Sequence, residues 1–104
     1  MSFRIDHPHT LPIADARARI RALGEYLANK HGLQVSWSGD DRASIRGRYL
    51  IVAIDGTVSV EERTVRFEGK DPGLLWRGKA RDYLSYKLGR YLDPAQALDA
   101  LPRR

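Results

Sequence analysis

Apolar and polar residues alternate in five stretches of the chain, a pattern typical of strands with one buried face. In the longest stretch the apolar residues share one parity, and they are Leu50, Val52, Ile54, Val58 and Val60. Gly47 or Gly56 is expected to mark a bulge or a sharp bend. The pattern predicts strands over residues 3–6, 33–37, 42–48, 49–60 and 65–69.

Two other stretches carry apolar residues at the three- and four-residue spacing of an amphipathic helix. Gly32 is suited to end the first helix, whose apolar stripe comprises Ile13, Ala16, Ile20, Leu23 and Leu27. The second helix opens at Asp71 and Pro72, and its stripe comprises Leu84, Leu88 and Leu92. Because Asp93 and Pro94 interrupt it, residues 93–104 are expected to form a short extra turn and a frayed tail.

The predicted element order is β-α-β-β-β-β-α, which indicates a single α+β domain over residues 1–104. Polar residues occupy one parity of the strands, so the antiparallel sheet of about five strands should be covered on one face only. Strands that follow each other through short turns pair most simply as a meander. We expect both helices to pack on the apolar face.

Composition narrows the possible classes of protein. A chain of 104 residues that is 42% hydrophobic has room for one modest core, and without cysteine it can form no disulfide. No apolar run approaches the roughly 20 residues that span a bilayer. The first ten residues lack the apolar centre of a signal peptide. We therefore expect a cytoplasmic protein without a membrane span.

The net charge of +5 permits contact with nucleic acid. Arg46, Arg48 and Arg66 fall on the polar parity of the predicted strands, so they would lie on the open face of the sheet. The same charge is also explained by ordinary solvation. The outward positions lack the aromatic residues on which sheet-based RNA readers stack bases. Nucleic-acid binding through these arginines is therefore an alternative function.

Residue patterns that would support catalysis or metal binding are weak. His7 and His9 have chelating spacing, but zinc sites need three or four protein ligands. The acidic pairs at residues 40–41 and 61–62 lie in predicted turns, where nothing shifts their pKa toward acid–base work. The chain has no nucleophile elbow, phosphate loop or dinucleotide fingerprint. We predict a protein that is not an enzyme and that has no catalytic residue, metal site or cofactor.

One shoulder of the second helix gathers large aromatic residues around a lysine. On a helical wheel this shoulder comprises Trp76, Tyr83, Lys87 and Tyr91. In one interpretation the rings form the half-buried boundary between helix and sheet, and the lysine stem snorkels across them. In the other they form a groove for a partner or the seam of a homodimer, since aromatic residues are enriched at interfaces.

Three segments resemble a small bacterial family, the polyhydroxyalkanoic acid system proteins. They are HPHTLPIADARARIRALGEYLANKHGLQVSW, IDGTVSVEERTVRFEG and GRYLD, and the likeness runs over about residues 3 to 95. The matching positions are His7, His9, Leu11, Ala14, Ala16, Arg17, Ile54, Gly56, Val58, Val60, Leu92 and Asp93. Residues 49–52 look like an insertion. The resemblance implies a granule-associated or regulatory role in polyester storage, with no catalytic residue to carry over.

These observations favour a non-enzymatic α+β domain that binds a polyhydroxyalkanoate granule or a granule protein. The expected partner-binding residues are Trp76, Tyr83, Lys87 and Tyr91. A nucleic-acid module that uses Arg46, Arg48 and Arg66 is one alternative. The other is a pocket for a small apolar ligand between the sheet and the second helix. That alternative requires a cavity of a few hundred Å³.

Overall fold

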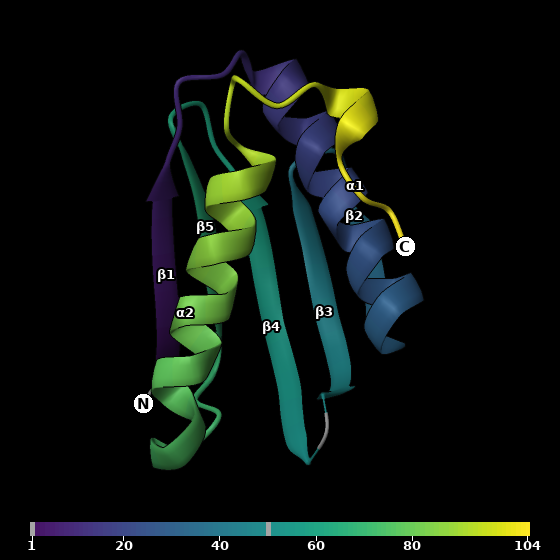
Figure 1. Ribbon diagram of the computed structural model, residues 1–104. Coiled ribbons are helices and arrows are strands. Elements are labelled where there is room, and N and C mark those ends of the chain that lie inside the picture. The colour runs from purple at the N-terminus through teal and green to yellow at the C-terminus, as the bar shows by residue number, and fades with distance from the viewer. Residues whose placement is uncertain (1, 50) are drawn as a thin grey trace.

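The computed structural model describes residues 2–49 and 51–104 and has the predicted α+β architecture (Figure 1). Five strands and two α-helices follow each other in the expected order, and a short 3-10 helix comes last. The elements are β1 (Ser2–Pro8), α1 (Ile13–His31), β2 (Gln34–Ser38), β3 (Arg42–Tyr49), β4 (Val52–Val60), β5 (Thr64–Lys70), α2 (Leu74–Tyr91) and η1 (Leu98–Ala100).

The strands form one antiparallel sheet in the order β1-β5-β4-β3-β2. Strands β2 to β5 are the predicted meander, and β1 lies beside β5 at the opposite edge from β2. The register places apolar residues in a continuous row across all five strands, because partners in an antiparallel pair point to the same face. One such row comprises Ile5, Phe67, Val58, Ala43 and Trp37.

The predicted parity of the longest strand is confirmed for the part of it that the structure describes. Val58 and Val60 are buried, and Ile54 is partly buried against the core. Thr57 pairs with Glu68 and Ser44, so it belongs to the polar face. Leu50, the first residue of the predicted run, lies outside the described residues. The predicted strand over residues 49–60 is divided in the structure, because Tyr49 ends β3, Ile51 lies in a turn and β4 begins at Val52.

Both helices cover the same face of the sheet (Figure 1). Helix α1 packs on β2 and β4 with its stripe of Ala16, Ile20, Leu23 and Leu27, which are all buried. Helix α2 packs mainly on β1. Among the described residues no helix lies on the other face of the sheet, which agrees with the polar residues predicted there. The core therefore lies between one sheet face and a pair of separated helices.

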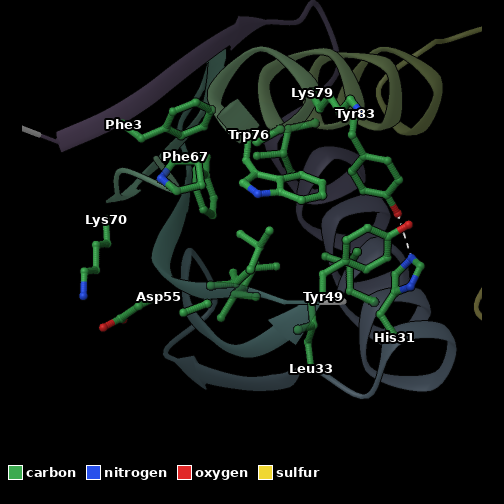
Figure 2. A pocket seen from close by; sticks show the side chains of 18 residues that line it. Phe3, His31, Leu33, Tyr49, Asp55, Phe67, Lys70, Trp76, Lys79 and Tyr83 are labelled. Atoms are coloured by element: carbon green, nitrogen blue, oxygen red, sulfur yellow. Dashed lines mark hydrogen bonds between the residues drawn. The ribbon is translucent and has the colours of Figure 1, made fainter. Parts of the chain in front are cut away.

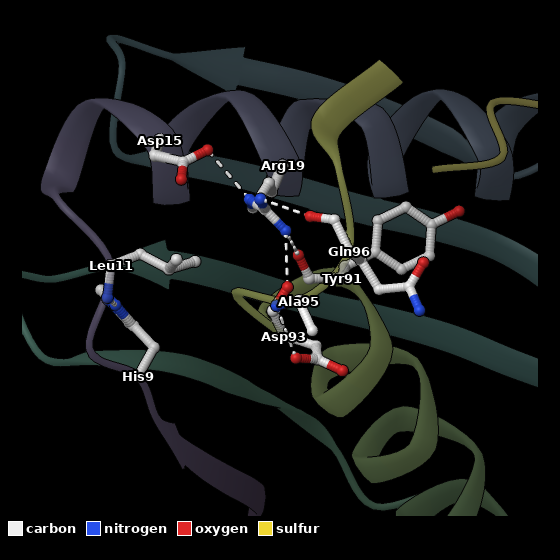
Figure 3. Close-up of polar contacts among 8 residues, drawn as sticks. All are labelled: His9, Leu11, Asp15, Arg19, Tyr91, Asp93, Ala95 and Gln96. Carbon is white, nitrogen blue, oxygen red and sulfur yellow. Dashed lines mark hydrogen bonds and ion pairs between the residues drawn. The ribbon is translucent and has the colours of Figure 1, made fainter. Parts of the chain in front are cut away.

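Arg19 joins the two helices at one end of the molecule (Figure 3). Its side chain is 5% exposed, and its Nε donates to Asp15 Oδ1 at 2.9 Å. Nη1 donates to the carbonyl oxygens of Tyr91 and Asp93 at 3.2 and 2.9 Å, and Nη2 donates to that of Gln96 at 2.7 Å. The last carbonyls of a helix lack intrahelical partners. Arg19 therefore supplies a partner for the last carbonyl of α2 and for two carbonyls of the segment after it.

The short extra turn predicted within residues 93–104 is present, and the residues after it lie along α1. Leu101 is 3% exposed and belongs to the core. Asn29 Nδ2 donates to the Arg103 carbonyl oxygen at 2.8 Å, and the Tyr91 hydroxyl donates to the Pro102 carbonyl oxygen. The tail lies along α1 because Leu101 buries apolar surface there, and these hydrogen bonds hold its backbone. The extra turn is the 3-10 helix η1.

Candidate functional site

A pocket opens where the two helices stop facing each other. Helices α1 and α2 run antiparallel, since Arg19 contacts Tyr91 and His31 contacts Tyr83. Helix α1 ends at His31, where Gly32 takes the left-handed conformation with φ 68°. The first two turns of α2 therefore extend beyond α1. A cavity of about 380 Å³ lies between this part of α2 and the sheet.

The pocket wall is almost entirely carbon (Figure 2). Helix α2 and the β3–β4 hairpin contribute most of the residues, and β5 contributes Phe67 and Lys70. The main side chains are Trp76, Ala80, Tyr83, Tyr49, Ile54 and Phe67. Pockets of about 300–1,000 Å³ with apolar walls and few polar groups are typical small-molecule sites. The second alternative function required such a cavity.

The tip of the β3–β4 hairpin forms one wall of the pocket. Pairing of β3 with β2 ends at Arg46, and pairing of β4 with β5 ends at Gly56. Beyond these residues the two strands pair only with each other. Gly47 has φ 146°, and a Cβ there would lie 2.9 Å from Leu33 Cδ2. Glycine thus allows the hairpin to pass close to Leu33, another residue of the pocket wall.

Polar atoms at the pocket come together at one side of it. His31 Nε2 lies 3.0 Å from the Tyr83 hydroxyl, and the His31 ring packs edge-on against Tyr49 at 4.7 Å between centroids. The Tyr49 and Tyr83 rings are stacked at 6.2 Å. We call His31, Tyr49 and Tyr83 the polar cluster. Figure 2 shows its hydroxyl groups close together on one side of Trp76.

Two groups of the polar cluster, His31 and Tyr83, have pKa values that are shifted toward their neutral forms. Burial lowers the pKa of His31, and the positive charges of Lys30 and Lys87 lower it further. Burial also raises the pKa of Tyr83 to about 12. The pair can therefore exchange hydrogen bonds with a neutral oxygen atom without separating charges.

Charged side chains lie at the rim of the pocket. In Figure 2, Lys70 and Asp55 extend outward on the side opposite to the polar cluster. Asp55 forms an ion pair of 3.5 Å with Arg46 on the open face of the sheet. The Lys79 ammonium lies 5.4 Å from the centre of the Trp76 ring, in cation–π contact. Asp55, Lys70 and Lys79 thus line the pocket at its rim, and two of them are engaged in contacts of their own.

The structure divides the four residues predicted to bind a partner. Trp76 and Tyr83 are half-buried and line the pocket. Lys87 is 8% exposed, and its Nζ lies 4.1 Å from the centre of the Tyr26 ring. Tyr91 is completely buried, so this member of the shoulder belongs to the core and is not accessible to a partner. A helical wheel contains one helix only, and Tyr91 is covered by the tail around Leu101 and Pro102.

Three strongly exposed apolar residues were missed in the sequence. Ile51 is 76% exposed in the turn of the β3–β4 hairpin, and Leu74 and Leu75 are 81% and 87% exposed at the start of α2. Both segments lie at the same end of the molecule (Figure 1). We call these three residues the apolar tip. Two sequence features could have identified them. Leu74 and Leu75 lie off the leucine stripe of α2, and Ile51 lies inside the apparent insertion.

The arginines of the nucleic-acid alternative lie on the open face of the sheet, and carboxylates neutralise two of them. Arg66 pairs with Asp6 at 2.7 Å and with Glu61 at 3.2 Å. Arg46 pairs with Asp55. Within residues 2–49 and 51–104, Arg48 forms no ion pair. The face is therefore less basic than the count of arginines indicated.

His9, one of the two histidines with chelating spacing, uses both of its ring nitrogens in contacts within the chain. His9 Nδ1 accepts a hydrogen bond from the Leu11 N–H at 3.1 Å, and Nε2 lies 2.9 Å from the Glu61 carbonyl oxygen. Both ring nitrogens are thus engaged in holding the turn before α1. Across the described part of the chain, no three metal-ligating side chains gather in one place.

Among residues 2–49 and 51–104, no helix is long and apolar enough to span a bilayer.

Comparison with known proteins identifies a family. Residues 3–95 match the family described as "Putative polyhydroxyalkanoic acid system protein". No curated protein and no solved structure matches the chain. Since the match covers most of the chain, the protein belongs to this family, as the resemblance of its segments had indicated.

Proposed function

We propose that this member of the polyhydroxyalkanoic acid system family is a non-enzymatic cytoplasmic protein that attaches to the surface of polyester granules. The apolar tip carries the proposal. Ile51, Leu74 and Leu75 come from two separate segments and expose most of their surface at one end of the molecule. Exposed apolar residues that gather in this way mark interaction sites. The polyester of a granule offers an apolar partner.

The energy available from the apolar tip is sufficient for reversible attachment. Burying a leucine or isoleucine side chain contributes about 1.5–3 kcal/mol. Three such residues supply several kcal/mol before the cost of immobilising the protein is subtracted. Trp76, at the rim of the pocket one residue after Leu75, can add to the contact. Attachment through the tip should therefore be reversible and cooperative between the two segments.

The proposal of a non-enzymatic role is supported by the chemistry of the polar cluster. A nucleophile or general acid needs a pKa near the working pH or a base that activates it. Burial moves the pKa of Tyr83 to about 12, away from neutral pH. His31 contacts the rings of Tyr49 and Tyr83 and the Tyr83 hydroxyl. This arrangement is suited to binding neutral oxygen atoms.

Co-sedimentation with purified granules tests the attachment. The double variant Leu74→Ser/Leu75→Ser should lower the bound fraction at least about tenfold, because two buried leucines are lost from the contact. Ile51→Ser alone should lower it less. The matched control is Tyr86→Ser, since Tyr86 is 64% exposed on the same helix but lies about three turns away from the tip.

Two results would contradict the proposal. The first is a bound fraction that is the same for the wild-type protein and the double leucine variant. The second is an equal loss of binding with Tyr86→Ser, which would indicate unspecific adhesion. Sedimentation velocity without granules must accompany the assay. If the leucine variant turns a dimer into a monomer, the apolar tip is a subunit interface and the granule proposal fails.

A further inference from the structure

We infer that the pocket between α2 and the β3–β4 hairpin binds one neutral hydroxyacyl ester of about a dozen heavy atoms, the chemical class of a polyester chain end. The pocket and the apolar tip are different groups of residues. The inference takes its ligand class partly from the proposed function, and it concerns binding in solution without a granule.

The size of the pocket sets the size of the ligand. A water molecule occupies about 30 Å³ in the liquid, so 380 Å³ corresponds to roughly a dozen heavy atoms. The wall of aromatic and aliphatic side chains fits an alkyl chain, and burying such a chain is favourable over the whole contact. An ester of a medium-length hydroxy acid has this size and this mainly apolar surface.

The polar cluster selects a neutral polar group. Tyr83 and His31 already share a hydrogen bond, and each retains capacity for one more. Within the described residues, the Tyr49 hydroxyl forms no hydrogen bond to another part of the chain. A hydroxyl donates to the carbonyl oxygen of an ester and accepts from an alcohol. A hydroxy ester therefore matches donors and acceptors that would otherwise need water.

A free carboxylate fits the pocket less well. An ionised group that leaves water without a charged partner is costly. Lys70 extends away from the cavity, beside Asp55, and the ammonium of Lys79 rests against Trp76 at the rim. Lys87 acts on His31 through its positive charge, but its Nζ lies over the Tyr26 ring at 4.1 Å and the residue does not line the pocket. A carboxylate beside the polar cluster would therefore contact His31 and Tyr83 and not an ammonium group. The pocket should therefore prefer the ester to the acid of the same chain.

Displacement of a fluorescent apolar probe, N-phenyl-1-naphthylamine, measures this preference. The compounds are methyl 3-hydroxyoctanoate and the sodium salt of the same acid. The ester should displace the probe at least about tenfold more effectively than the acid. Ala80→Phe fills the pocket and should weaken both probe and ester at least about tenfold. Circular dichroism confirms that this variant is folded, and Val52→Phe fills the pocket from the hairpin side if it is not.

Hydrogen bonding is tested by Tyr83→Phe, which keeps the ring and removes the hydroxyl. The affinity for the ester should fall about fivefold, in line with the loss of one neutral hydrogen bond. Tyr86→Phe makes the same change at an exposed position outside the pocket and should leave the affinity unchanged.

Three results would overturn the inference: no displacement by the ester, equal or stronger displacement by the acid, or unchanged affinity when the pocket is filled. Failure of granule attachment is a separate result. Leu74→Ser/Leu75→Ser should keep its affinity for the ester within about twofold, because neither leucine lines the pocket.

Discussion

At the scale of single residues, Arg19 has the largest structural role of the buried polar groups. It connects α1 to three carbonyl groups at the end of α2 and beyond it, over more than seventy positions of sequence. A buried arginine with several hydrogen bonds cannot be removed without leaving its partners unpaired. Removing the Arg19 side chain should therefore be costly mainly because it leaves these buried partners without a hydrogen bond.

Arg19→Met should lower the free energy of unfolding by about 3–5 kcal/mol, because buried carbonyl oxygens and Asp15 lose their partner. Urea denaturation measures the change. Arg17→Met is the control, since Arg17 pairs with Asp41 on the exposed surface, and it should cost about 1 kcal/mol or less. Equal effects of the two substitutions would show that the hydrogen bonds of Arg19 do not stabilise the helix pair.

Arg19 also shows what residue patterns leave out. Spacing along α1 predicts the buried positions of Ile20, Leu23 and Leu27, because each follows from the helical period alone. Arg19 is buried although it is charged, and its partners are carbonyl groups far along the chain. Backbone carbonyls carry no sequence signature, so local pattern cannot predict such a contact. Tyr91 is a similar case, because the carbonyl oxygen to which its hydroxyl donates belongs to Pro102, which lies outside α2 and outside its helical wheel.

At the scale of elements, the β3–β4 hairpin depends on one backbone conformation. Gly47 has φ 146°, which side-chain-bearing residues rarely adopt, and a Cβ would approach Leu33 within 2.9 Å. Gly47→Ala should therefore lower stability by about 1–3 kcal/mol. Gly78 lies in α2, and a Cβ added there would meet no atom within 4 Å. Gly78→Ala should raise stability by about 0.5–1 kcal/mol, since alanine favours the helix.

Thermal unfolding of both glycine variants measures these opposite shifts. A stabilising Gly47→Ala would mean that the hairpin relaxes without touching Leu33. Gly47 was one of two positions at which a bulge or bend was expected. Its φ is positive, but the pairing of β3 with β4 continues through it without a bulge. The pocket beside it was only one alternative among three, because a cavity depends on where α1 stops relative to α2. The position of the end of α1 relative to α2 depends on how the two helices pack against each other. It cannot be predicted from the sequence of either helix alone.

At the scale of the whole molecule, the ion pairs on the open sheet face determine how strongly salt should weaken any binding to nucleic acid. The net charge is +5, yet Arg46 and Arg66 on the open sheet face are paired with carboxylates. Each phosphate contact adds about −0.9 to the slope of log K against log salt concentration. With few free arginines on the face, the slope for a duplex should be shallower than about −3. Fluorescence anisotropy with a labelled duplex at several salt concentrations gives this slope.

Removing the carboxylates that pair with the sheet-face arginines tests whether these carboxylates prevent the face from binding nucleic acid. Asp6→Asn/Asp55→Asn/Glu61→Gln removes the carboxylate partners of Arg66 and Arg46, so the slope should steepen by at least about two phosphate contacts. Asp40→Asn is the control, because Asp40 lies on the turn before β3 and is 79% exposed, 3.8 Å from Arg21. A wild-type slope of about −6 or steeper would contradict the argument, since it needs more free cations than the sheet face offers. It would also favour nucleic acid over polyester as the partner, because binding to an apolar surface depends little on released counterions.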